Sequence, residues 1–238
     1  MTIPTDNRQR TSQTLAGVLK AALRDGERFC CVKTANHYAV FDKLDIDPSE
    51  AKEFIGQLDA LTGSARLLKN GATCFVSAIR LHGRDYVVKR YNPKGLLHSI
   101  RHTLKRSRAR RGWLNALRLR HLGISTPRPA AFIEEYAGFL LKRSWLITEL
   151  ASGPKLYEYL ADSEISKVQK TKVIDQVFDI LTRLDRHRIT HGDLKHTNLI
   201  VTPDGPTLID LDSLKIHKTG LFYLYHRKKD LNAFDFTA

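Results

Sequence analysis

The sequence has little cysteine and no long apolar stretch, and both shortages limit what the protein can be. Its 238 residues include three cysteines, Cys30, Cys31 and Cys74, and none belongs to a CxxC motif or to a Cys/His pair with zinc-ligand spacing. We therefore expect no disulfide framework and no structural zinc, and a reducing cytosol is the compartment that fits. No segment reaches about 18 uninterrupted apolar residues, so we expect neither a membrane span nor a signal peptide.

Acidic residues are missing from one part of the chain. None occurs between Asp85 and Glu134, where Lys, Arg and His are dense, and the whole chain has a formal net charge of +14 and a pI of about 9.8. This surplus favours an anionic partner such as nucleic acid, phospholipid, or a phosphorylated or carboxylated substrate, and a solvated helix face is the alternative. The residues that we predict to contact an anionic acceptor or membrane are Arg101, Lys105, Arg106, Arg108, Arg110 and Arg111.

The motif HGDLKHTN contains the residue types that phosphoryl transfer needs. Asp193 and Asn198 are separated by four residues, the interval between the proton-accepting Asp and the metal-binding Asn of a kinase catalytic loop. Turn residues from Pro203 to Gly205 then predict a hairpin that returns Asp210 beside Asn198. Oxygen ligands of this kind suit Mg²⁺ and a triphosphate, so we predict Asp193 as the catalytic base and Asn198 and Asp210 as metal ligands.

Three further residues lie close to these in the sequence. Lys195 is predicted to be catalytic by neutralising charge on the transferring phosphoryl group, and facing solvent is its alternative. His191 is expected to pack the catalytic loop rather than to act as a base. Asp212 occupies the place of a glycine in the protein-kinase metal motif, and it is either a turn residue or a further ligand.

A nucleotide site is predicted from two segments upstream. Lys89 lies in the strand-like run YVVKRY, where a kinase places the lysine that holds the α and β phosphates of ATP. The turn at Gly71, Ala72 and Thr73 is either a phosphate-binding turn or a plain hairpin, because it has one glycine rather than a glycine-rich loop. Glu149 would mark the hinge whose backbone meets adenine, and an ordinary strand end is the alternative.

The order of the apolar runs predicts an α+β, protein-kinase-like bilobal fold. We expect a small antiparallel five-stranded N-lobe with an inserted helix, then the linker ASGP, then a mainly helical, shortened C-lobe. The predicted domains are a leader and short helical cap at residues 1–62, the N-lobe at 63–150 and the C-lobe at 151–238. The five predicted strands lie within residues 64–69, 72–81, 86–91, 130–136 and 138–150.

Several motifs resemble one group of atypical kinases. HGDLKHTN has Gly192 where protein kinases usually have arginine, and with LIDLD it resembles the RIO, Bud32, aminoglycoside and lipopolysaccharide kinases. The stretches VVKRYN, RSRARRGWLNALRLRHLGISTPRPAAFIE and RKKDLNAF are most similar to the lipopolysaccharide core kinases. The resemblance spans roughly residues 64–234. It implies ATP and Mg²⁺ as cofactors, with Asp193 as base, Asn198 and Asp210 as Mg²⁺ ligands and Lys89 as the ATP lysine.

The same resemblance implies an acceptor, a location and partners. The acceptor would be a hydroxyl of 3-deoxy-manno-octulosonic acid or heptose in lipid A-linked core, phosphorylated at the cytoplasmic face of the inner membrane of a Gram-negative bacterium. The implied partners are this lipid A-core acceptor, the anionic inner-membrane surface and an accessory protein, with no DNA. Two other functions stay open: a RIO- or Bud32-like serine/threonine protein kinase, and a non-catalytic module that binds nucleic acid or anionic lipid.

One departure from the kinase pattern concerns the partner of Lys89. Kinases pair this lysine with a glutamate on the following helix, but the acid-free stretch contains none, and Gly112 stands near the expected position. We therefore expect Lys89 to pair with Asp210, or Asn115 to serve as a neutral partner.

Overall fold

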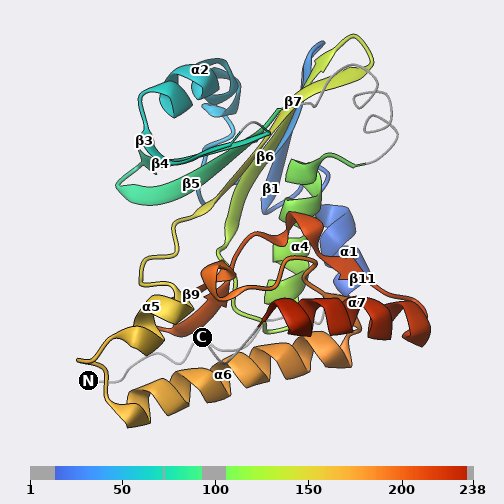
Figure 1. Cartoon of the computed structure of the whole chain (residues 1–238). Helices are drawn as coiled ribbons and strands as arrows, with labels where there is room; N and C mark the ends of the chain where they lie inside the picture. The colour runs from blue at the N-terminus through green and yellow to red at the C-terminus, as the bar shows by residue number, and fades with distance from the viewer. Residues whose placement is uncertain (1–13, 72, 93–105, 235–238) are drawn as a thin grey trace, which may run out of the picture.

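The computed structural model describes residues 14–71, 73–92 and 106–234, which form a sheet lobe and a helical lobe (Figure 1). This mixture of helices with a large antiparallel sheet confirms the predicted α+β class. The elements of the sheet lobe are α1 (Leu15–Ala21), β1 (Phe29–Lys33), β2 (His37–Asp42), α2 (Ala51–Gly63), β3 (Arg66–Gly71), β4 (Cys74–Leu81), β5 (Arg84–Tyr91), α4 (Arg108–His121), β6 (Pro129–Ala137) and β7 (Leu140–Glu149).

Within the described ranges the sheet has seven strands, so the predicted count of five is wrong. Its order is β1-β2-β6-β7-β5-β4-β3, and every neighbouring pair is antiparallel. The two additional strands, β1 and β2, come from the part of the chain that we expected to be a leader and cap. Both are short and apolar, and β2 lengthens the sheet by pairing with β6.

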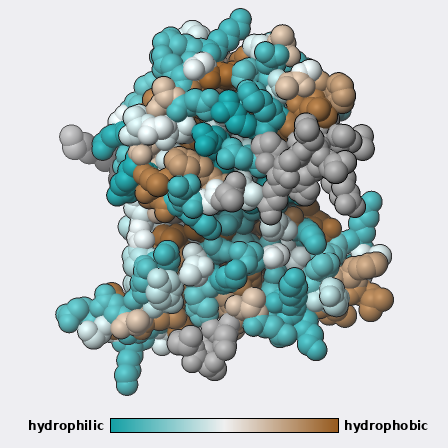
Figure 2. All heavy atoms as spheres, turned by 45° about the horizontal axis from the view of Figure 1, so that its top comes forward, coloured by the Kyte–Doolittle hydropathy of each residue, from teal (hydrophilic) through white to brown (hydrophobic). Residues whose placement is uncertain are grey.

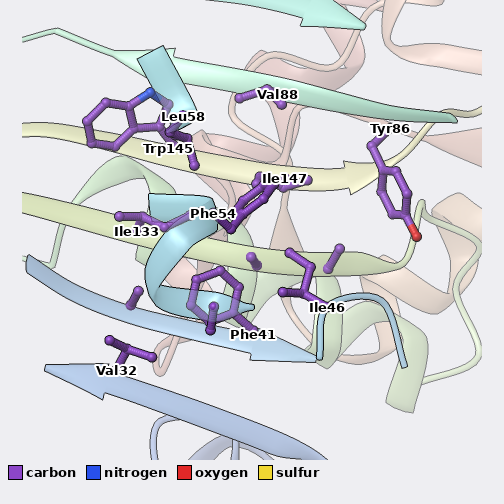
Figure 3. Close-up of a cluster of buried hydrophobic side chains, with 14 of the residues drawn as sticks. Val32, Phe41, Ile46, Phe54, Leu58, Tyr86, Val88, Ile133, Trp145 and Ile147 are labelled. Carbon is purple, nitrogen blue, oxygen red and sulfur yellow. The ribbon is translucent and has the colours of Figure 1, made fainter. Parts of the chain in front are cut away.

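The two faces of the sheet pack against different helices because successive strand residues point to opposite sides. On one face, Phe54 and Leu58 of α2 lie in a cluster with Phe41, Trp145 and Ile147 (Figure 3). On the other face, α4 packs against the alternate residues of the same strands, with fully buried Trp113 at its centre. The long helix α4 is therefore held rigidly behind the strand that carries Lys89.

The helical lobe has its own apolar core and carries the catalytic motif. Val177 and Leu184 of the longest helix pack in this core with Leu199 and Leu208 of a small hairpin. None of the helices in the described ranges is long and apolar enough to cross a membrane. The elements of this lobe are α5 (Leu156–Ala161), α6 (Lys167–Arg186), β8 (Ile189–Thr190), η1 (His196–Asn198), β9 (Leu199–Thr202), β10 (Gly205–Leu208), η2 (Leu211–Ser213), β11 (Lys215–Ile216) and α7 (Gly220–Ala233).

Candidate active site

The predicted catalytic loop begins at a histidine that holds backbone rather than substrate. His191 is fully buried, and its Nε2 lies 2.9 Å from the carbonyl oxygen of Ile209. Because a carbonyl can only accept, Nε2 must carry the proton. This contact ties the loop to the residue just before Asp210. This geometry agrees with the expectation that His191 packs the catalytic loop rather than acting as a base.

Asp230, which we did not single out from the sequence, anchors the same loop from helix α7. Its buried carboxylate accepts the backbone N–H of His191 at 2.6 Å and that of Gly192 at 3.0 Å. Buried N–H groups need such partners, and a carboxylate is a strong acceptor. A signal was present in the sequence: Asp230 is the single acid in the otherwise basic run HRKKD.

The structure explains why glycine follows His191. Gly192 has a φ of 82°, in the left-handed region, and a Cβ atom added there would lie 2.7 Å from the carbonyl oxygen of Ser213. Any L-residue at this position would be strained by its backbone conformation and would collide with the neighbouring strand connection. The arginine that protein kinases usually have here does not fit this loop.

Asp193, Lys195 and Asn198 lie together after this glycine. Lys195 Nζ is 2.6 Å from Asp193 Oδ1, and both side chains are about half exposed. The Asn198 Nδ2 group donates to the backbone oxygen of Asp193 at 2.8 Å and, at 3.4 Å, to its Oδ2. This donation leaves the Asn198 Oδ1 atom as the one that can coordinate a cation.

A hairpin brings the second predicted carboxylate to the same place. Strands β9 and β10 are antiparallel, with Leu199 opposite Leu208 and Thr202 opposite Gly205. Beyond this pairing, the Ile209 N–H donates to the Asn198 carbonyl at 2.9 Å. Asp210 follows with a φ of 65°, an uncommon left-handed conformation for a residue with a side chain. The predicted hairpin and the proximity of Asp210 to Asn198 are both present in the structure.

Lys89 pairs with Asp210, which was the first of the two expected alternatives. Its Nζ lies 2.8 Å from Asp210 Oδ1, and the lysine side chain is largely buried. Burial alone would raise the pKa of Asp210, but the adjacent Lys89 ammonium outweighs it and lowers that pKa to about 2. Asp210 is therefore ionised at any physiological pH.

The missing helix glutamate also has a steric explanation. An added Cβ at Gly112 of α4 would lie 2.6 Å from Leu146 Cδ2, so a longer side chain there would require the Leu146 side chain of β7 to move. The second alternative, Asn115 as a partner of Lys89, is wrong because its Nδ2 donates to the Leu211 carbonyl at 2.9 Å and its Oδ1 accepts from Arg118. Asn115 instead ties α4 to the segment that follows Asp210.

A second ion pair links α4 to this segment. Arg108, in the first turn of α4, donates from Nε to Asp212 Oδ2 at 2.7 Å, and its guanidinium lies 4.5 Å from the centre of the Tyr91 ring. Asp212 is almost fully buried, and burial together with the charge of Asp210 raises the pKa of Asp212 despite the opposing charge of Arg108. Asp212 therefore works as an internal anchor, because Arg108 already occupies its Oδ2.

The predicted nucleotide residues border one cavity between the lobes. This cavity has a volume of about 580 Å³ and is lined by Lys89, Glu149, Asn198 and Asp210, together with apolar side chains from both lobes. The N–H of Glu149 already donates to the Arg128 carbonyl at 2.9 Å, and its carboxylate pairs with the Arg128 guanidinium at 2.8 Å. Any contact of adenine with Glu149 would therefore use its carbonyl oxygen.

The predicted phosphate-binding turn is a tight hairpin loop. Gly71 pairs directly with Cys74, so a two-residue loop joins β3 to β4. The carbonyl of Thr73 accepts the N–H of Asn92 at 3.1 Å, whereas Ala72 lies outside the described residues. Neither Gly71 nor Thr73 borders the cavity, and phosphate binding by this turn stays a prediction.

The donor set fits a hard cation that also binds phosphate. Within the described ranges, no group of three or more His, Cys, Asp or Glu side chains could hold a metal alone. Mg²⁺ in nucleotide sites typically takes one or two protein oxygens and completes its shell with phosphate and water. Of the two predicted metal ligands, the contacts above leave Asp210 Oδ2 and Asn198 Oδ1 for this purpose.

The predicted basic surface is partly used inside the protein. Arg108 pairs with Asp212, and Arg110 pairs with buried Glu134 while its guanidinium lies 4.6 Å from the centre of the Tyr38 ring. Both guanidinium groups are therefore engaged in ion pairs within the protein, and contact of Arg108 or Arg110 with an anionic acceptor stays a prediction. Arg111 is half-buried and Arg106 is exposed. Arg101 and Lys105 lie outside the described residues.

These features define the class of the protein. The chain has a sheet lobe and a helical lobe, and the cleft between them holds Lys89, Asn198 and Asp210. This is the arrangement of a protein-kinase-like phosphotransferase.

The comparisons with known proteins narrow this class to one family. The family model of the lipopolysaccharide kinase (Kdo/WaaP) family matches residues 61–238, well over half of the chain, and the chain belongs to this family. One similar solved structure is WaaP in complex with acyl carrier protein, with 19% sequence identity and a TM-score of 0.58 over 81% of this chain and 79% of that chain. At this identity the likeness shows a shared fold. No sequence match was found among curated proteins.

Proposed function

We propose that the protein transfers the γ-phosphoryl group of ATP to a sugar hydroxyl of the lipopolysaccharide inner core, either 3-deoxy-manno-octulosonic acid or heptose. The observation that carries this proposal is the grouping of Lys89, Asp210 and Asn198 in one cavity, with Asp193 exposed beside them. Membership of the lipopolysaccharide kinase family supports the acceptor class.

ATP would occupy the cavity with its adenine at the hinge and its phosphates at Lys89. The N–H groups of Glu149 and Leu150 already donate to the Arg128 and Asp85 carbonyls, so the adenine would use the next N–H group, that of Ala151. Lys89 would leave Asp210 to bind the α and β phosphates, or it would contact Asp210 and the phosphates together. The positive charge that now neutralises Asp210 would then come from the metal.

Mg²⁺ would be held by Asp210 and Asn198 and would neutralise charge on the β and γ phosphates. The other roles belong to side chains of this protein. Asp193 would accept the proton of the attacking sugar hydroxyl, whose oxygen forms the new bond to phosphorus while ADP departs. Lys195, 2.6 Å from Asp193, would orient that carboxylate and offset charge on the transferring group. The exposure of both side chains gives a bulky saccharide access to the base.

The proposed location follows from the proposed acceptor. A lipid A-core acceptor would place the protein peripherally at the cytoplasmic, anionic face of the inner membrane, and its net charge of +14 supports attraction to that surface. An accessory protein is a further proposed partner, and the acyl carrier protein named with the structural neighbour is the first one to test. DNA is not a proposed partner.

Competition between acceptors tests the proposal. The purified protein would be incubated with γ-labelled ATP, Mg²⁺ and a mixture of deep-rough lipopolysaccharide, total RNA and protein extract. We expect the label in the lipopolysaccharide, and none when Asp193 is replaced by Asn. Label that enters only protein bands would favour the RIO- or Bud32-like reading, and the absence of any Mg²⁺-dependent ATP turnover would favour the non-catalytic module.

A further inference from the structure

The first half of helix α7 carries an unusual amount of exposed apolar surface. Leu221, Phe222, Leu224 and Tyr225 have exposed fractions of 80%, 67%, 60% and 70%. With His226 and Lys228 they line a shallow depression. In Figure 1 this half of α7 forms the outer right end of the helical lobe, and brown apolar atoms are visible at the lower right edge of Figure 2. A monomeric protein rarely exposes such a cluster without a partner.

Lysines precede and follow these four side chains along the chain, and the partly exposed acid that contacts α7, Asp185, is paired with Tyr223 and Arg227. Lys215, Lys218, Lys228 and Lys229 are exposed, and none lies within ion-pairing distance of a carboxylate in the described part of the chain. The two acids between residues 211 and 233, Asp212 and Asp230, are both buried, one against Arg108 and one against the catalytic loop.

The lysines stand in a definite relation to the apolar residues along the helix. Lys228 and Lys229 follow Leu224 and Tyr225 by four positions, so they lie one turn farther along the same exposed face. Lys218 lies just before the first residue of α7, on the N-terminal side of the apolar residues. The apolar end of the helix thus has lysines before and after it along the chain. Their long side chains could reach lipid phosphates while the apolar side chains enter the boundary between headgroups and acyl chains.

We propose that this apolar end of α7, with its flanking lysines, is the surface by which the protein docks on an anionic phospholipid bilayer. The inference rests on the proposed action on a lipid-anchored acceptor for its biological purpose, but its physical test needs no catalytic activity. It adds a second basic surface to the one that the sequence had suggested, of which Arg108 and Arg110 take part in internal ion pairs.

Charge argues against a second copy of the chain as the occupant. A two-fold contact joins the same patch of both copies, so it would bring Lys218, Lys228 and Lys229 of both copies into one interface. An anionic lipid surface instead neutralises all of them and also accepts the apolar side chains.

The position of Asp230 gives this docking a consequence for the site. Asp230 lies nine residues after Leu221, which is about 13 Å along the helix axis, and its carboxylate holds the backbone of His191 and Gly192. One rigid helix therefore connects the proposed membrane contact to the catalytic loop. Docking through α7 would hold Asp193 at a set height above the lipid surface.

Fluorescence quenching by lipids tests insertion directly. Phe222→Trp would be mixed with phosphatidylglycerol-containing vesicles whose acyl chains carry bromine. We expect quenching and a blue shift of its emission, while the emission of native Trp113 and Trp145 stays constant because both are buried away from the bromine. The control is Phe139→Trp, on the β6–β7 hairpin, where the native side chain is 80% exposed against 67% for Phe222, and it should not be quenched. Equal quenching of both variants, or of neither, would overturn the proposal.

Vesicle sedimentation separates the contributions of apolar and charged side chains. The double variant Leu221→Ser with Phe222→Ser should lower the vesicle partition coefficient by about 10-fold or more. The control double variant, Phe139→Ser with Val168→Ser, should not change it, although both native side chains are 80% exposed. Lys228→Gln with Lys229→Gln should lower it by roughly 10-fold, and the exposed α6 pair Lys167→Gln with Lys172→Gln by less.

Other results in the same assays would identify a different occupant. If the parent protein failed to bind the vesicles, or bound neutral ones equally well, the lipid proposal would fail. A dimer that Leu221→Ser with Phe222→Ser dissociates would make this surface a contact between copies, and loss of a complex with acyl carrier protein but not of vesicle binding would make it a protein-docking surface. Phosphorylation of a lipid-free core oligosaccharide should be unchanged in this variant, which separates failure of docking from failure of the proposed chemistry.

Discussion

The Lys89 ammonium lies 2.8 Å from the Asp210 carboxylate, so the third strand of the predicted N-lobe is tied directly to the segment that follows the β9–β10 hairpin. In most kinases a glutamate of the following helix pairs with this lysine instead. Here α4 contacts the segment after Asp210 through Arg108 and Asn115, and a side chain in place of Gly112 would first have to displace Leu146. The helix therefore positions the metal-binding segment rather than the lysine.

Replacing Lys89 by Met should lower kcat/KM for ATP by about 10²- to 10³-fold, because a fixed cation beside the phosphates is lost. Steady-state kinetics with varied ATP would measure this. Lys69, which is exposed and borders the same cavity, provides the matched control, and Lys69→Met should change kcat/KM several-fold at most. Similar losses in both variants would mean that general positive charge, rather than the Lys89 position, supports the reaction.

Breaking the Arg108–Asp212 pair should destabilise the fold. Arg108→Ala leaves the buried Asp212 carboxylate unpaired, and we expect a loss of about 2 kcal/mol, below the range for fully buried pairs because Arg108 is partly exposed. Adding Asp212→Asn should restore part of that loss, so the double variant should be more stable than the sum of the single changes predicts. Urea unfolding measures all three. Strictly additive losses would show that the pair is not coupled.

Asp230→Ala should reduce turnover more than it changes the KM for ATP. It removes the acceptor of two buried N–H groups in the catalytic loop, which displaces Asp193 without touching the nucleotide cavity. The control is Asp185→Ala, which removes a different anchor of α7, the one to Tyr223 and Arg227. Equal effects on kcat would indicate that general loosening of α7, not the loop contact, is responsible.

Gly192→Ala should cost more stability than Gly83→Ala, although both glycines have left-handed φ angles of 82° and 77°. An alanine at residue 83 meets no atom within 4 Å, whereas at residue 192 it meets the Ser213 carbonyl at 2.7 Å. We expect both to show the left-handed penalty of about 1–2 kcal/mol and only Gly192→Ala to add a collision. Denaturant unfolding of the pair decides this, and equal losses would contradict the steric account.

The sequence predicted the local features of the site well because they depend on short spacings. The interval from Asp193 to Asn198 and the turn from Pro203 to Gly205 are each contained within a few residues, and backbone geometry then brings Asp210 back to Asn198. The choice of Lys89 followed from its place in a strand, and the absence of a nearby acid led to two expected partners, Asp210 and Asn115, of which the structure shows Asp210.

Features that depend on distant contacts were missed. Arg108 and Asp212 are 104 positions apart, and Asp230 meets the catalytic loop across 38 positions, so neither contact has a local pattern. Strands β1 and β2 are five and six residues long, and they are recognisable as strands only when β6 provides an edge for pairing. The basic residues of α4 suggested an external surface because Glu134 and Asp212, their internal partners, lie outside the acid-free stretch.

The most direct test of the account is phosphorus NMR of a purified lipid-free inner-core oligosaccharide after incubation with the protein, ATP and Mg²⁺. We predict a new phosphomonoester on a sugar carbon, formed in equal amount to ADP, and a rate that falls by roughly 10²- to 10⁴-fold in Asp193→Asn, the usual contribution of a positioned base. ADP that forms without a sugar phosphomonoester, or a sugar phosphomonoester that forms at an unchanged rate in Asp193→Asn, would contradict it.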